Sequence, residues 1–136
     1  MEEIVIDGKN ATLGRLASYT AKQVLLGKKI VIINSNEIII TGKKKDILSK
    51  YQVLINKGGS SLKGPKIIRT PERIMKRTIR GMLSHKQNRG SEALKRVICY
   101  NDTPEKYSEV KKIKAGKEKK TKFITLKELS SLLKND

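Results

Sequence analysis

Arginine is concentrated in one stretch of this 136-residue chain, between Arg69 and Arg96. Six of the seven arginines lie there, at positions 69, 73, 77, 80, 89 and 96, whereas lysines occur along the whole chain. The planar guanidinium group can donate two parallel hydrogen bonds, a geometry that suits phosphate oxygens. The clustering therefore favours binding of a polyanion.

A helix beginning near Pro71 is predicted to position most of these arginines. Thr70 is a candidate N-cap, and Pro71 suits the first helical position. At about 100° per residue the side chains separate into two arcs. The cationic arc holds Arg73, Lys76, Arg77 and Arg80, and the mostly apolar arc holds Ile74, Met75, Thr78, Ile79, Met82 and Leu83. We expect the apolar face to dock on a core and the cations to form an exposed ridge.

A charged face that only contacts water is the usual interpretation of such a pattern. A solvated face normally carries both signs of charge, yet the segment from Arg73 to Gln87 contains no acid. Closely spaced cations repel one another on an isolated helix, and a partner rich in negative charge would relieve that repulsion. Polyanion binding is therefore favoured over simple solvation.

Other basic residues are candidates for the same role. The run from Lys43 to Lys45 lies at the start of a predicted helix, where positive charge is unfavourable beside the helix dipole. Contact with phosphate would remove this cost. The only histidine, His85, has Lys86 and Arg89 as neighbours, so a nucleic-acid contact is favoured over a role as general base.

The net charge of the whole chain also favours a polyanionic partner. It is +18, from 31 Lys+Arg against 13 Asp+Glu, and the pI is about 10.1. Nucleic acid is the first candidate partner for such a chain. A membrane is disfavoured, because tryptophan is absent and the purest apolar run, Ile30 to Ile33, is too short to span a bilayer. A single cysteine excludes an internal disulfide framework, and we expect a cytoplasmic protein without a signal peptide.

The N-terminal part of the chain predicts a βαβ unit. Ile4–Ile6 favours a strand, the spacing from Leu13 to Val24 favours a helix, and Lys29–Asn34 favours a second strand. The crossover between the two parallel strands should be right-handed. The later predicted elements are a strand at 37–40, a helix at 47–55, an exposed loop at 57–66, the arginine-rich helix, a polar loop at 84–90, one helical turn at 91–94 and a buried strand at 97–100.

The chain is predicted to form one domain with a C-terminal extension. A single α/β RNA-binding domain is assigned to residues 1–107, a lysine-rich extended segment to 108–122 and a C-terminal helix to 123–136. Thr125 and Glu128 have the spacing of a capping box, which opens that helix.

No combination of residues indicates catalysis. The glycines at 59–64 have P-loop spacing, but Pro65-Lys66 replaces the required Lys-Ser/Thr. Cys99 lies among apolar residues and is interpreted as a buried small side chain rather than a nucleophile. One histidine and one cysteine do not make an ordinary zinc site. We predict no enzymatic activity, metal, cofactor or small-molecule substrate, and a nucleotide-binding α/β enzyme is the minor alternative.

Aromatic residues are scarce, at 4% of the chain. Tyr51, Tyr100 and Tyr107 could stack on bases, but so few rings do not form an RRM-like stacking surface. Recognition of a nucleic acid is therefore expected to rest on phosphates, on RNA shape and on the 2′-hydroxyl group.

Several motifs resemble one protein family. The segment Arg77–Lys86, followed by Arg89-Gly90 and Val97–Tyr100, resembles the core signature of the universal large-subunit ribosomal protein thirteen. Leu13–Ser18 is similar to the N-terminal half of the same family. Gly64-Pro65 and the C-terminal segment resemble its archaeal and eukaryotic branch.

This resemblance implies a three-layer α/β/α fold with a small, mostly parallel four-stranded sheet. It also implies a structural role in the cytoplasmic large ribosomal subunit, with large-subunit ribosomal RNA and neighbouring ribosomal proteins as partners. By the family motifs, the RNA contacts would come from Arg15, Arg73, Arg77, Arg80, His85, Lys86 and Arg89. The charge pattern adds Lys43, Lys44, Lys45, Arg69 and Lys76. A free RNA-binding regulator outside the ribosome is the alternative within the nucleic-acid class.

Overall fold

The computed structural model describes residues 2–55, 69–109, 112–114 and 121–134. The predicted loop at 57–66, with its P-loop-like glycines, lies outside the described residues. No helix within the described ranges combines the length and the apolar character needed to cross a membrane.

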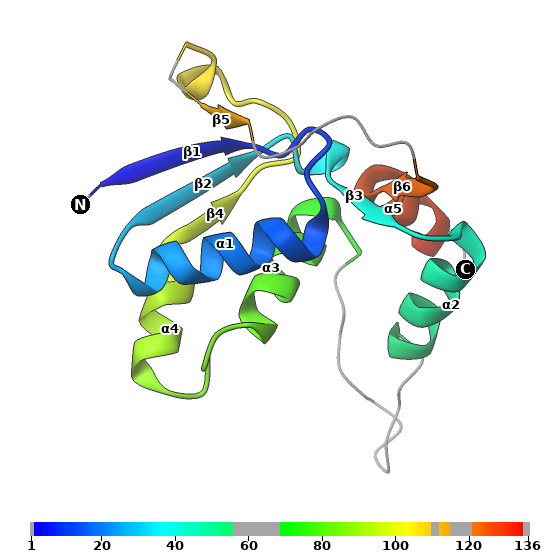
Figure 1. Cartoon of the computed structure of the whole chain (residues 1–136), viewed down its shortest axis with the longest axis horizontal. Helices are drawn as coiled ribbons and strands as arrows, with labels where there is room; N and C mark the ends of the chain where they lie inside the picture. The colour runs from blue at the N-terminus through cyan, green and yellow to red at the C-terminus, as the bar shows by residue number, and fades with distance from the viewer. Residues whose placement is uncertain (1, 56–68, 110–111, 115–120, 135–136) are drawn as a thin grey trace.

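Four parallel strands form the main sheet, in the order β4-β2-β1-β5 (Figure 1). Their bounds are β1 Glu3–Asp7, β2 Lys29–Ile33, β4 Val97–Cys99 and β5 Ile113–Lys114. The inner strand β2 is buried on both faces, which explains its unbroken apolar run. The predicted βαβ unit and the small parallel sheet are confirmed.

Three helices cover one face of this sheet (Figure 1). They are α1 Leu13–Leu25, α3 Pro71–Gly81 and α4 Asn88–Lys95, and α1 packs against both of the others. Ile6, Ile30 and Ile32 project from the sheet into the core that these helices share. The helix carrying the arginine ridge is thus anchored on a broad apolar base.

The opposite face of the sheet has a thinner cover. Val5, Val31 and Ile33 are buried there with Tyr107, which belongs to the single-turn 3-10 helix η2 at Glu105–Tyr107. The Tyr107 ring lies 5.9 Å from the ring of Tyr100, centre to centre. The predicted α/β class holds, with one short turn as the third layer.

A second, antiparallel pair of strands lies beside the main sheet. It joins β3 Ile39–Thr41 to β6 Phe123–Thr125, and helices α2 Lys44–Ile55 and α5 Leu126–Lys134 pack against each other next to it. One half of the predicted capping box is present, because the Glu128 backbone N–H donates to Thr125 Oγ1 at 3.2 Å, whereas the Glu128 carboxylate pairs with Lys44. The strand at β6 was not predicted.

Helix α4 is longer than the sequence pattern suggested. The prediction of one helical turn at 91–94 after a loop ending at Gly90 was wrong, since α4 begins at Asn88. The reason is close packing: Gly90 is buried, and a Cβ atom there would overlap the carbonyl group of Ser84. Glycine therefore lets the first turn of α4 lie directly against the preceding loop.

Candidate nucleic-acid interface

The apolar face of α3 docks on the core as predicted, but of the four cations on its other face only Arg73 is fully exposed. Ile74, Met75 and Ile79 are buried, while Arg73 is exposed and Arg77 is half-buried. Lys76 and Arg80 are half-buried as well. Met82 departs from the prediction, because the helix ends at Gly81 and leaves its side chain 46% exposed.

The ridge is not neutralised by acids of the described part of the chain. The ion pairs among the described residues join Lys28 to Glu2, Lys29 to Glu3, Lys44 to Glu128 and Lys95 to Glu92. None of them includes an arginine. The cations of α3 therefore keep their charge available for an external partner.

Two of the predicted contact residues also serve the fold. Arg69 Nη1 donates to the carbonyl oxygen of Leu133, at the end of α5, at 2.6 Å. Lys76 Nζ donates to the carbonyl oxygen of Val97 at 3.1 Å. Each side chain retains further N–H donors, because a guanidinium group has five and an ammonium group three. Both residues remain half-exposed.

The Lys76 hydrogen bond yields a stability prediction. Lys76→Met keeps the aliphatic stem but removes the donor, so the Val97 carbonyl loses its partner. We expect the free energy of unfolding, measured by urea denaturation, to fall by about 1 kcal/mol. Lys86→Met is the matched control, since Lys86 is exposed and should change stability by less than about 0.5 kcal/mol. Equal losses in the two variants would contradict this role of Lys76.

The loop after α3 and the first turn of α4 present the next group of predicted residues. His85, Lys86 and Arg89 are all exposed. The loop is shaped by tight backbone turns, with Gln87 N–H donating to Ser84 O at 2.9 Å. The structure thus places these side chains directly beyond the end of the arginine ridge.

Arg15 and Lys43 come together at a different place. Arg15 lies in the first turn of α1, Lys43 directly precedes α2, and both line a hollow of ≈ 540 Å³ with Lys122. The lysine run itself diverges. Lys44 is paired with Glu128 at 3.1 Å, and Lys45 is exposed but does not line the hollow.

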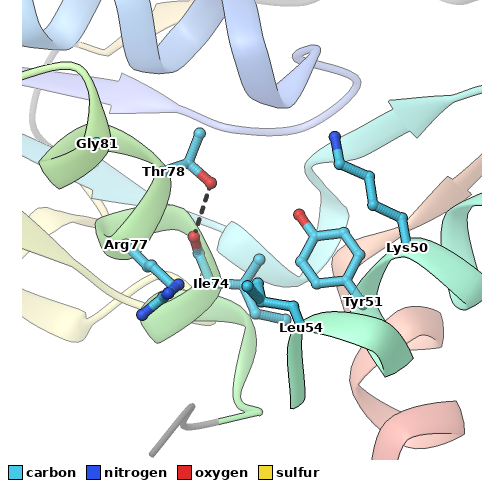
Figure 2. A pocket seen from close by; sticks show the side chains of 7 residues that line it. All are labelled: Lys50, Tyr51, Leu54, Ile74, Arg77, Thr78 and Gly81. Carbon is cyan, nitrogen blue, oxygen red and sulfur yellow. Dashed lines mark hydrogen bonds between the residues drawn. The ribbon is translucent and has the colours of Figure 1, made fainter. Parts of the chain in front are cut away.

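This hollow continues toward α3. A second hollow of ≈ 570 Å³ shares Thr12, Gly42 and Lys43 with the first. It meets a third, of ≈ 180 Å³, at Lys50, Tyr51 and Thr78 (Figure 2). We call the combined feature the basic groove, after its cations Arg15, Lys43, Lys50, Arg77 and Lys122.

Sequence reasoning missed Lys50 and Lys122 as members of the groove. Lys50 was passed over within the helical pattern of α2, and Lys122 within the lysine-rich segment. One acid, Asp46, also lines the groove, and it is exposed. The cations outnumber it, so the groove is electropositive along its length.

Nothing in the described part of the chain suggests catalysis. Cys99 is largely buried, and burial raises the pKa of its thiol to about 12; the Lys76 cation lowers this pKa and the Glu72 carboxylate raises it, each by less. A thiol with that pKa is not a nucleophile near neutral pH. No group of three or more His, Cys, Asp or Glu residues in the described ranges could hold a metal ion.

These features define a class of protein: a small, strongly basic α/β domain with a cationic helix and groove. The chain belongs to the ribosomal protein L13 family, whose family model matches residues 1–106. The predicted resemblance is therefore confirmed. The family is one of ribosomal proteins and not of enzymes.

Individual relatives support the same assignment over nearly the full length. The large ribosomal subunit protein uL13 of Picrophilus torridus is 43% identical over 133 residues, covering 96% of each chain. The protein of the same name from Methanocaldococcus jannaschii is 46% identical over 132 residues, covering 95% of this chain and 96% of the relative. The match to the protein of the same name from Caenorhabditis elegans is shorter: it is 44% identical over 114 residues, covering 82% of this chain and 56% of the relative.

Proposed function

We propose that this chain is a structural constituent of the cytoplasmic large ribosomal subunit, where it binds and stabilises folded large-subunit rRNA and aids subunit assembly. The observation that carries the proposal is the row of cations on α3, docked by its apolar face and unpaired with acids of the described residues. The names of the relatives support the same subunit.

The proposed mechanism is electrostatic and needs no cofactor. Arginine and lysine side chains replace the counterions around RNA phosphates, and the release of those ions favours binding. Because α3 is already packed on the core, its backbone needs no ordering on binding, and the conformational cost falls on the side chains. The residues proposed to contact rRNA are Arg15, Lys43, Lys44, Lys45, Arg69, Arg73, Lys76, Arg77, Arg80, His85, Lys86 and Arg89.

Neighbouring large-subunit proteins are the other proposed partners. Exposed apolar side chains outside the cationic surface suit such contacts, and Leu26, at 66% exposed, lies at the end of α1 remote from Arg15. We propose that protein contacts lie at this end of the domain, while RNA lies along α3 and the groove.

Sedimentation distinguishes the ribosomal function from a free RNA-binding regulator. An epitope-tagged chain expressed in its own cells is expected to travel with large subunits in a sucrose gradient, and to leave them when salt is raised enough to release counterions. A chain that stays at the top of the gradient at low salt, while still binding RNA, would favour the regulator.

A further inference from the structure

The α3 end of the basic groove differs in character from the rest of it. Here the hollow of ≈ 180 Å³ is lined mainly by carbon, between α2 and α3 (Figure 2). Tyr51, Leu54 and Ile74 form its apolar walls. Lys50 on α2 and Arg77 on α3 flank it. We call this hollow the α2–α3 pocket.

The size of the α2–α3 pocket limits what can occupy it. Pockets for cofactors and drug-sized ligands usually measure about 300–1,000 Å³. At ≈ 180 Å³ this one suits a single flat ring system. Gly81 keeps one side open, since a Cβ atom there would meet no other atom within 4 Å.

The charges beside the pocket favour an RNA base over an apolar protein side chain. An aliphatic side chain would gain nothing from two flanking cations, whereas each nucleotide within a strand has a phosphate on either side of it. Lys50 also lines the adjoining hollow that contains Lys43, so positive charge continues away from the pocket. Unpaired bases of RNA commonly stack on aromatic rings beside such cations.

The polar atoms of the pocket suit the edge of a base. Burial raises the pKa of the Tyr51 hydroxyl, opposed in part by the nearby Arg77 cation, so the group stays protonated near neutral pH. It can therefore donate one hydrogen bond and accept others. The Thr78 hydroxyl donates to Ile74 O at 2.9 Å, which leaves its oxygen able to accept (Figure 2).

We propose that the α2–α3 pocket holds one unstacked base of a single-stranded rRNA segment, with the base on the Tyr51 ring and the flanking phosphates on Lys50 and Arg77. The proposal rests on the rRNA-binding function proposed above. It adds one specific base contact, at Tyr51, to recognition that we expect to rest mainly on phosphates, RNA shape and the 2′-hydroxyl group.

Three variants test the pocket through their binding affinity for a folded transcript of the large-subunit rRNA from the same organism. Tyr51→Leu removes the ring, and we expect about 10-fold weaker binding with an unchanged dependence on salt. Tyr51→Phe keeps the ring and should stay within about 3-fold of the wild type. Gly81→Leu fills the opening without removing any group, and should weaken binding about as much as Tyr51→Leu.

Arg77→Ala is the electrostatic comparison, because it should lower the slope of log K against log salt by about one. Val53→Ala is the matched control on α2, since Val53 is 64% exposed and does not line the pocket. Thermal unfolding of each free variant checks the fold. If the Tyr51→Leu chain unfolds at a lower temperature than the wild type, the binding of Gly81→Leu decides the test, because a Cβ atom at position 81 meets open space.

Ultraviolet crosslinking of native large subunits, followed by mass spectrometry, identifies the occupant. A peptide containing Tyr51 linked to one nucleotide supports the proposal. A link to another ribosomal protein, or to residues 56–68 of this chain, would overturn it. If Tyr51→Leu and Gly81→Leu both bind with wild-type affinity while Arg77→Ala binds more weakly, the base pocket is refuted but the rRNA-binding function is not. Failure of the wild-type chain to bind the transcript would overturn the rRNA-binding function as well.

Discussion

Replacing Arg77 and Arg80 with glutamate is expected to exclude the chain from large ribosomal subunits while leaving it folded. Both side chains are half-buried on the ridge of α3, and neither has an acidic partner among the described residues. A hydrogen bond between charged groups contributes about 1.5–3 kcal/mol, so two lost phosphate contacts predict at least 100-fold weaker rRNA binding. Repulsion between glutamate and phosphate adds to this loss.

The fold should tolerate the double substitution. The core of α3 is made by Ile74, Met75 and Ile79, which are unchanged. Arg80 lies in the last turn, where a glutamate costs about 0.3–1 kcal/mol through the helix dipole. Lower net charge partly offsets that cost by reducing repulsion within the chain.

The measurement is the share of tagged protein that co-sediments with large subunits. Lys127→Glu with Lys106→Glu is the matched control, because it makes the same change in net charge. Lys127 is exposed in the first turn of α5, and Lys106 is exposed on the η2 side of the sheet. Normal incorporation of the Arg77/Arg80 variant, or equal exclusion of the control, would refute a specific role for the ridge.

Gly90→Ala is expected to be the most damaging single-methyl change in the described helices. The new Cβ would overlap the backbone carbonyl of Ser84, which cannot move as a flexible side chain could. We expect the free energy of unfolding to fall by about 1–3 kcal/mol. The loop from Ser84 to Gln87 must shift, and His85 and Lys86 shift with it.

Gly14→Ala is the matched control for that experiment. Gly14 is also helical, but a Cβ atom there meets nothing within 4 Å. Because glycine is a poor helix former, this change should raise stability by about 0.5–1 kcal/mol. Urea denaturation compares the two variants, and rRNA binding shows the loop displacement. A Gly90→Ala chain as stable as Gly14→Ala would contradict the packing described for α4.

Local signals in the sequence were sufficient for much of the fold. The apolar run in β2, the spacing of α1, and Thr70-Pro71 before α3 each depend on residues close in the chain, and each element forms where expected. The β3–β6 pair was missed because its partners lie more than eighty positions apart, as in the pairing of Ile40 with Ile124. No local pattern in Phe123–Thr125 distinguishes a strand from the residues before a helix.

Part of the candidate interface could likewise be predicted from local sequence, and part of it could not. The ridge of α3 is visible in the sequence because Arg73, Arg77 and Arg80 repeat at helical spacing. The basic groove is not, since Arg15, Lys50 and Lys122 come from three distant segments and meet only through tertiary packing. The internal hydrogen bond of Arg69 was also hidden, because its acceptor is a backbone carbonyl near the other end of the chain.

Lys76 has a consequence for the chain before it joins its particle. Strand β4 ends the main sheet, and alternate carbonyl groups of an outermost strand are open to pairing with a second copy. The carbonyl oxygen of Val97 points away from β2, and it accepts a hydrogen bond from the Lys76 ammonium group. We therefore expect the Lys76 side chain to hinder edge-to-edge aggregation of the free chain. Lys76 belongs to α3, the same helix that is proposed to bind RNA.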